Sequence, residues 1–360
     1  MISARKIQGR KTVAVLPVHY PRELFTAMDI RTVELWGPPG PPRGPDAGRI
    51  QTYACAIVRN ALAFLASGGA DAVDAVLFPH TCDSIQGLAT LAPDFGGWEK
   101  PALRYLHPKG EDRPAARAFV RAELVHLADR LAELTGSPLE IPRLAAAIGL
   151  HAKIDRLRGA LLSRRAFLGM GDPALYRLLR RGEFLGPEDH LAELADAARG
   201  LGEERMQRGI PLMVTGYVPE PMTLFDSLEA AGAFIAADDY AAVGRRVPAA
   251  PPAVGGDPLD TLAAKAFAMP PCPTRGGDQD ARMEYLASLY RHSGAAGLIV
   301  HVQKFCEPEL FDFPAIRRRF ARIGAPLLYL EGELENSLSG QVITRLEAFV
   351  EMVDAGRMSP

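Results

Sequence analysis

Short apolar runs alternate with amphipathic stretches in the first third of the chain, and this pattern predicts alternating strands and helices. The apolar runs have the length and composition of buried strands, and they lie at residues 13–16, 32–36, 75–78 and 102–106. Helical periodicity occurs at residues 22–28, in the stretch CAIVRNALAFLA that begins at Cys55, and in the stretch that follows Cys82. The first third is therefore predicted to form one α/β unit.

The same alternation returns in the last part of the chain. Strands are predicted at residues 211–215, 233–237, 297–302 and 327–330. Helices are predicted at residues 222–231, 259–268, 282–290, 313–323 and 341–353. Helices between successive strands are typical of parallel sheets with right-handed crossovers.

The middle of the chain is purely helical in pattern. Segments such as RAFVRAELVHLADRLAELTG carry apolar residues at three- and four-residue spacing, and no strand pattern interrupts them. The Gly- and Pro-rich run at residues 37–48 predicts a surface loop. We predict an α/β fold with two Rossmann-like parallel-sheet domains, residues 1–112 and 207–360, and a helical layer or insert, residues 113–206.

Composition and charge narrow the class of protein. The chain has 360 residues, of which 48% are hydrophobic and 23% charged, as in an ordinary soluble globular protein. The net charge of −2 favours neither nucleic acid nor an anionic membrane as a partner. No apolar run approaches the roughly 18 residues of a membrane span. The start MISARKIQGRKTVAVLPVHYP fits a first strand better than a signal peptide, so we expect a cytoplasmic protein.

The four cysteines are the residues that decide the chemistry. Cys55, Cys82, Cys272 and Cys306 are too few and too scattered for a disulfide scaffold. Cys82 and Cys306 each follow a predicted strand by four residues, and ligands gather beyond the carboxyl ends of parallel strands. Cys55 opens a helix, whose N-terminus lowers the pKa of a thiol and favours the thiolate. Free cysteines usually just pack, however, and no CxxC motif is present, so spacing alone leaves a metal site and a structural role both open.

Six segments of the chain are distinctive when taken together: VHYPRELFTAMDI, YACAIVRNAL, LFPHTCDSIQGL, MPPCPTR, GLIVHVQKFCEPELFDFP and APLLYLEGELENSLSGQVITRLEAFVEM. They resemble the cluster-bearing subunits of 2-hydroxyacyl-CoA dehydratases and benzoyl-CoA reductases. They occur in the order found in the family and span almost the whole chain. The Cys-Asp pair after a strand, the Lys-Phe-Cys-Glu-Pro block and the closing Thr-Arg-x-Glu-Ala-Phe together make the resemblance specific.

The resemblance implies that Cys55, Cys82 and Cys306 bind a 4Fe–4S cluster in the cleft between the domains, and that Cys272 is structural or supports the ligands. Three thiolates would leave one iron open. The family's reaction injects a low-potential electron into an acyl-CoA thioester, which enables either loss of an α-hydroxyl group or ring reduction. The implied partners are a homologous cluster-bearing subunit, in a heterodimer or homodimer, an ATP-hydrolysing iron–sulfur activator, and the acyl-CoA substrate.

Acid–base residues are less clearly marked than the cysteines. His80 and His301 lie within a few residues of Cys82 and Cys306, and Glu331 follows the predicted strand 327–330. These three are weak candidates for catalysis, because a histidine is more often hydrogen-bonded in a core and a glutamate more often caps a helix or forms a surface ion pair. Asp83 is expected to support the Cys82 loop through bonds to backbone N–H groups.

Two rival functions stay open. One is a homo-oligomeric small-molecule reductase with a bridged double cluster, which would need more thiolates than the four cysteines here. The other is a non-catalytic scaffold or assembly subunit of the same fold, although the three candidate ligands are all present. The chain contains neither GxxxxGK[ST] nor GxGxxG after a strand, so ATP and dinucleotides are expected to bind elsewhere.

Overall fold

The structure, a computed structural model, describes residues 10–37, 40, 50–107, 109–206, 209–248 and 256–358. The loop predicted at residues 37–48 lies almost entirely outside these ranges. Within them, no helix combines the length and the apolar character that crossing a membrane requires.

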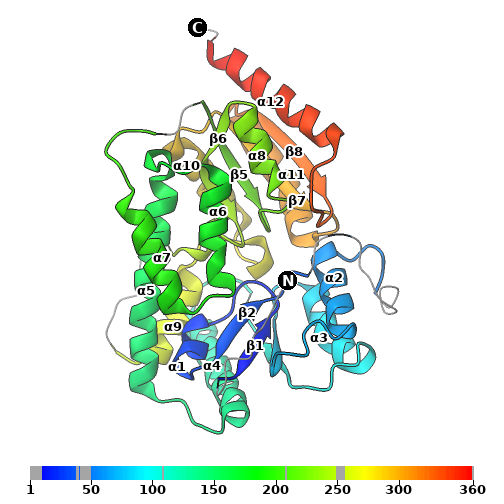
Figure 1. Cartoon of the computed structure of the whole chain (residues 1–360), viewed down its shortest axis with the longest axis vertical. Helices are drawn as coiled ribbons and strands as arrows, with labels where there is room; N and C mark the ends of the chain where they lie inside the picture. Colours follow the sequence, from blue (N-terminus) through cyan, green and yellow to red (C-terminus); the bar gives the residue numbers. More distant parts are fainter. Residues whose placement is uncertain are drawn as a thin grey trace.

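Two four-stranded parallel sheets form the framework (Figure 1). The first contains β1 (Thr12–Val15), β2 (Arg31–Glu34), β3 (Ala75–Pro79) and β4 (Ala102–Tyr105), in the order β2-β1-β3-β4. The second contains β5 (Ile210–Gly216), β6 (Ala233–Tyr240), β7 (Gly297–Gln303) and β8 (Leu327–Gly332), in the order β6-β5-β7-β8. All eight predicted strands are confirmed, and the two halves share one topology.

The helices between the strands cover the sheets and bury them on both faces. In the first half they are α1 (Arg22–Ala27), α2 (Ala56–Ala66) and α3 (Asp83–Phe95). In the second half they are α8 (Thr223–Ala230), α10 (Gln279–Ser293) and α11 (Glu307–Arg322), and α12 (Gly340–Met358) follows the last strand. The remaining helix, α9 (Pro258–Ala268), packs against the helical middle segment of the chain instead. Every residue of β1 and β7 is buried, as expected for strands covered on both faces.

The predicted start of α11 at residue 313 is wrong, because the helix begins at Glu307. Pro308 and Pro314 weaken the helical pattern in the sequence. Pro308, however, lies in the first turn, where the missing N–H has no intrahelical partner to lose, and Pro314 is accommodated inside the helix. Cys306 therefore precedes the helix directly.

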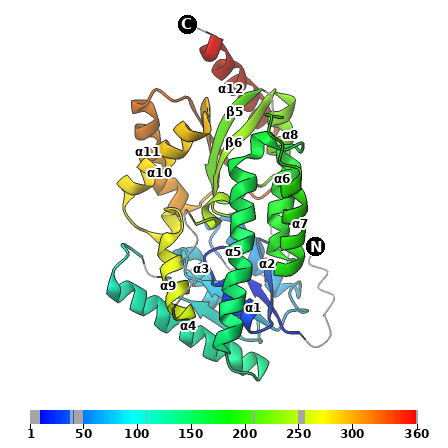
Figure 2. The ribbon, with the colours of Figure 1, turned by 90° about the vertical axis from the view of Figure 1, so that its left-hand side faces the viewer.

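The helical middle segment forms a layer that contacts both sheets. It consists of α4 (Pro114–Thr135), α5 (Ile141–Ser163), α6 (Asp172–Arg180) and α7 (Pro187–Arg199), with short 3-10 turns between some of them. The long helix α5 packs against α1 of the first half and reaches β6 of the second, and Figure 2 shows it running along both halves. Within residues 113–206, all of which are described, the only extended pairing is a single bridge between Leu168 and Leu201.

The carboxyl ends of the two sheets face each other. The hydroxyl of Tyr217, directly after β5, donates to the carbonyl of Pro17, just after β1, at 3.3 Å. Arg246, which follows β6, donates from both of its terminal nitrogens to Glu34, the last residue of β2, at 2.7 Å each. The edge where open α/β sheets bind ligands therefore lies at the junction of the two halves.

A buried network of charges fixes α11 and the segment before α10 to the second sheet. Arg245 is fully buried and donates to Glu309 in the first turn of α11 at 2.5 Å and to Asp239 on β6 at 3.1 Å. Arg282 donates to the same Asp239 at 2.6 Å and to Asp312 at 3.2 Å. Each buried cation therefore has two carboxylate partners.

We predict that Arg245→Met lowers the free energy of unfolding by about 3–5 kcal/mol, because Glu309 would stay buried without a cation. The matched control is Arg319→Met, since Arg319 pairs with Glu284, whose side chain is 58% exposed. We expect Arg319→Met to lower the free energy of unfolding by at most about 1 kcal/mol. Urea unfolding of both variants measures the two losses of unfolding free energy. Equally small losses would contradict the view that Arg245 neutralises the buried Glu309.

Candidate functional site

The three predicted cluster ligands occupy equivalent local positions. Cys55, Cys82 and Cys306 are the residues immediately before α2, α3 and α11. Cys82 comes three residues after the end of β3 at Pro79, and Cys306 comes three residues after the end of β7 at Gln303. Because β3 and β7 hold the same place in the two sheets, these two cysteines leave matching strand ends.

The three thiols lie in one electrostatic environment. Burial raises the pKa of Cys55 to about 12, and the neighbouring Cys82 contributes to the rise. Burial raises the pKa of Cys306 well above its usual value, and both Cys55 and Cys82 add to this effect. Residues distant in sequence are thus brought within electrostatic reach of one another.

The helix N-termini act on the thiols in the predicted direction, but burial outweighs them. Backbone N–H groups of Ile57 and Val58 lower the pKa of Cys55, and those of Ser84 and Ile85 lower the pKa of Cys82. The net pKa of both thiols is nevertheless raised, so the prediction of a lowered thiol pKa at Cys55 is wrong for the protein without a bound cation. Desolvation of the thiolate is the larger effect.

Tyr217 marks the centre of this region, and nothing in the sequence pattern singled it out. Its side chain is buried, and its pKa is raised well above the usual value by burial and then by Cys82, Cys306 and Cys272. The same hydroxyl bonds to Pro17 across the junction. All four cysteines therefore lie around the meeting point of the two sheets.

The sulfur of Cys272 is hydrogen-bonded to one cationic group and one neutral group. Arg245 donates to its sulfur at 3.4 Å, and the hydroxyl of Thr274 lies 3.1 Å from the same atom. The thiol is thus engaged by the buried network that fixes α11. This environment supports the structural role expected for Cys272, which stays a prediction.

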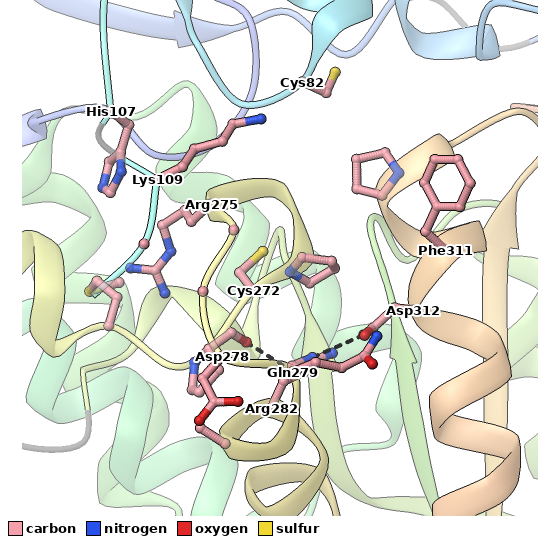
Figure 3. A pocket seen from close by; sticks show the side chains of 18 of the residues that line it. Cys82, His107, Lys109, Cys272, Arg275, Asp278, Gln279, Arg282, Phe311 and Asp312 are labelled. Atoms are coloured by element: carbon pink, nitrogen blue, oxygen red, sulfur yellow. Dashed lines mark hydrogen bonds and ion pairs between the residues drawn. The ribbon is translucent and has the colours of Figure 1, made fainter. Parts of the chain in front are cut away.

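A cavity of about 470 Å³ lies beside Cys82 at the junction (Figure 3). Cys82, His107 and Lys109 border it from the first half. The segment between α9 and α10 contributes Cys272 and Arg275, α10 contributes Arg282, and α11 contributes Glu307, Phe311 and Asp312. Its volume is within the range of small-molecule sites. His107 and Lys109 were missed in the sequence, although they follow β4 just as Cys82 follows β3.

The weaker catalytic candidates His80, His301 and Glu331 are not among the residues that line this cavity. His80 is half-buried, and its backbone N–H donates to the carbonyl of Tyr105. His301 is inside β7, with Nδ1 2.8 Å from the hydroxyl of Tyr240, and burial lowers its pKa to about 4. Glu331 is exposed on β8. The structure thus does not bring these three together at the cavity, whereas Asp83 does border it.

Among the described residues, no group of three or more His, Cys, Asp or Glu side chains has the spacing needed to hold one metal ion. A single ion requires all its ligands at about 2–2.3 Å from one point. The cysteines are thus not arranged as a mononuclear site.

Comparison with known proteins gives one family across nearly the whole chain. The family model described as 2-hydroxyglutaryl-CoA dehydratase, D-component, matches residues 17–353. The beta subunit of lactoyl-CoA dehydratase from Anaerotignum propionicum is 24% identical over 351 residues, covering 96% of this chain and 92% of that protein. The beta subunit of (R)-2-hydroxyglutaryl-CoA dehydratase from Acidaminococcus fermentans is 24% identical over 365 residues, covering 98% and 94%. A benzoyl-CoA reductase subunit from Thauera aromatica is 27% identical over 341 residues, covering 89% and 85%.

We predict that His301 makes the protein sensitive to acid. Its pKa is about 4 in the folded chain and about 6.5 in an unfolded one, so the unfolded state binds the extra proton first as the pH falls. The contribution of His301 to stability is therefore complete above about pH 6.5 and decreases by about 1.4 kcal/mol per pH unit down to about pH 4.

The test compares His301→Asn with the wild type by urea unfolding at several pH values between 7.5 and 4. Asparagine preserves a polar atom near Nδ1 but cannot be protonated. The variant should lose less stability than the wild type over the acid range, whatever its starting stability. Parallel curves for the two proteins would contradict the prediction.

Proposed function

Because the chain belongs to the 2-hydroxyglutaryl-CoA dehydratase D-component family, we propose that it is the 4Fe–4S-carrying subunit of an acyl-CoA enzyme. The enzyme is either an (R)-2-hydroxyacyl-CoA dehydratase or a reductase of the benzoyl-CoA type. The relatives named above are subunits of enzymes of these two kinds, which supports an enzyme subunit rather than an independent scaffold.

The observation that carries the proposal is the placement of the cysteines. Cys55, Cys82 and Cys306 precede three different helices, lie where the two sheets meet, and influence one another's pKa. The three thiols are buried or half-buried, form no disulfide, and come from three separate segments of the chain, which supports a joint role as ligands.

A 4Fe–4S cubane is the group that we propose for these three thiols. In a cubane each thiolate binds a different iron, so the sulfurs are separated by roughly 6–7 Å and no common point lies at bonding distance from all three. The backbone N–H groups at the starts of α2 and α3 are directed at Cys55 and Cys82 and would stabilise negative sulfur. A bound cationic cluster would also reverse the raised thiol pKa values, since coordination deprotonates a thiol.

The cavity beside Cys82 is the proposed place for the reacting part of the acyl-CoA. When bound, the cluster would supply the low-potential electron that an acyl-CoA thioester needs. The chain's own residues would exclude water and position the substrate: Phe311 offers an apolar surface, and Lys109 and Arg275 offer positive charge (Figure 3). The acyl group itself is selected by the shape of this cavity.

The electron must come from another protein. The sequence has no phosphate-binding glycine loop, whereas an electron of such low potential requires coupling to ATP hydrolysis. We therefore propose two partners, a homologous cluster-bearing subunit and an ATP-hydrolysing iron–sulfur activator. The relatives are each named as one subunit among others, which supports the first of these.

Iron stoichiometry separates this proposal from its rivals. One cubane gives about four iron atoms per chain, a bridged double cluster about eight, and a scaffold none. The functional test is turnover of 2-hydroxyacyl-CoA and of benzoyl-CoA under anaerobic conditions, with the partner subunit and activator present. Conversion of neither substrate by a complex that carries its full iron would refute the proposal.

We predict that Cys55→Ser, Cys82→Ser and Cys306→Ser each lose most of the bound iron and sulfide and most of the EPR signal of the reduced protein. Serine replaces a soft thiolate with a poor ligand for iron. Cys272→Ser is the matched control, since Cys272 is also buried at the junction but bonds to Arg245 and Thr274. Equal iron loss in Cys272→Ser and Cys82→Ser would contradict the proposed ligand set.

We also predict that the isolated chain neither binds nor hydrolyses ATP. Turnover of the assembled enzyme should require ATP and the activator, and exposure to air should abolish it by oxidising the open iron. Calorimetry with ATP and the chain alone checks the first part. Tight binding there, or sustained activity in air without an activator, would contradict the prediction.

A further inference from the structure

A second cavity, of about 100 Å³, lies among α1, α4, α5 and α9 and the loop that follows β1. Its lining contains five cationic side chains: Arg22, Arg158, Arg246, Lys265 and Arg275. Among the described residues of this lining, the carboxylates are those of Glu23 and Asp155. Of these five cations, the proposed acyl-CoA site uses Arg275 alone, which also lines the cavity beside Cys82.

Three of the five cations are neutralised by carboxylates. Lys265 donates to Glu23 at 2.7 Å and to Asp155 at 2.6 Å, so both carboxylates of the lining are engaged by one ammonium. Arg22 and Arg246 both bond to Glu34, at 2.5 Å and 2.7 Å. A single carboxylate therefore serves two guanidinium groups.

Arg158 and Arg275 have no carboxylate partner in the described part of the chain. Arg158 is 2% exposed, and its guanidinium makes no hydrogen bond or ion pair to any described residue. Arg275 is 8% exposed and donates only to the carbonyls of Ala266 and Pro270, while its Nε is buried without a partner. Carbonyls satisfy hydrogen bonds but do not neutralise the charge.

The carboxylates nearest to Arg158 are bonded to other cations. Its charge is influenced by Asp155, Glu34 and Glu183, and Glu183 accepts from Arg180 at 2.8 Å. Burial lowers the pKa of Arg158 to about 10, which still leaves it charged at neutral pH. An unpaired, buried guanidinium is costly in free energy, so it needs a compensating anion.

The remaining polar groups do not balance this excess. Burial lowers the pKa of His19 and of His151, so both are neutral at pH 7. Five cations thus face the carboxylates of Glu23, Asp155 and Glu34. One water molecule needs roughly 10–15 Å³ of cavity volume. The cavity, at about 100 Å³, therefore has room for a group of several atoms.

We propose that this cavity binds a small oxyanion, a carboxylate or phosphate group, with Arg158 as its main ligand and Arg275 as a second cation. The planar guanidinium fork matches both groups. The cavity shares His107, Ala266, Met269 and Arg275 with the larger one beside Cys82. The anion is therefore either a free ion or the charged end of a longer ligand that extends toward Cys82. This proposal stands on the residues of the cavity and does not depend on the iron–sulfur proposal.

The test uses the full-length chain in an anion-poor buffer, titrated with inorganic phosphate and with acetate, and with chloride at equal ionic strength. We expect a saturable rise of a few degrees in the melting temperature with phosphate or acetate and none with chloride. Arg158→Met should abolish the response. Without anion it should melt no lower than the wild type, since it removes an unpaired buried charge. Arg156→Met, an exposed position on the same helix, is the matched control and should preserve the response.

Two results overturn the proposal: a wild-type response to phosphate and acetate no greater than to chloride, or an unchanged response in Arg158→Met. If Arg158→Met does not fold, Arg158→Lys replaces it. Lysine preserves the charge but loses the fork, so we expect anion binding at least tenfold weaker, and unchanged binding overturns the proposal.

A second arm identifies the source of the anion by comparing succinyl-CoA, which ends in a carboxylate, with butyryl-CoA, which does not. At least tenfold tighter binding of succinyl-CoA, lost in Arg158→Met, assigns the site to the end of the acyl chain. Equal binding of the two, together with the phosphate or acetate response, assigns it to a free oxyanion. Both results support an anion site at Arg158.

Discussion

The buried carboxylate of Asp239, at the end of β6, is the interaction on which the position of α11, and of Cys306 before it, depends. It accepts from both Arg245 and Arg282 and from the hydroxyl of Thr215, and its pKa is lowered because the two guanidinium groups outweigh the effect of burial. The two arginines in turn hold Glu309 and Asp312 on α11 and the carbonyl of Pro271 before α10. The start of α11, and with it Cys306, is therefore positioned by charge rather than by apolar packing alone.

Two buried regions of the molecule differ in their balance of cations and carboxylates. Around Asp239 each guanidinium has carboxylate partners, so the network is complete within the chain and can act as a rigid support. Around Arg158 the cations exceed the carboxylates among the described residues, and this excess is the basis of the proposed anion site. The first network supports a neighbouring site by its rigidity, whereas the second is proposed to bind a ligand through its excess charge.

The sequence predicted the framework well, because the framework depends on local patterns. All eight strands are four to eight residues long and overlap the short runs that predicted them, and the helices between them leave little choice but parallel pairing. The start of α11 was not predictable in the same way. A proline such as Pro308 disrupts the interior of a helix but is well tolerated in its first turn, and the sequence alone does not show which position it occupies. The pKa of Cys55 was misjudged for a related reason. A helix N-terminus is visible in sequence, but the burial that outweighs it is a property of the whole fold.

The shared topology of the two sheets explains why three cysteines, and not four, form the proposed ligand set. Cys55 lies between the second and third strands of its sheet, and Cys272 lies in the corresponding interval of the other. The two differ in their surroundings. Cys272 accepts from Arg245, which already serves Asp239 and Glu309, so its sulfur belongs to a region whose charges are matched. Cys55 instead has another thiol as its electrostatic neighbour, and burial keeps its own thiol protonated until a metal displaces the proton. Corresponding intervals of the two halves thus place their cysteines in different surroundings, and of these two we propose Cys55 alone as a ligand.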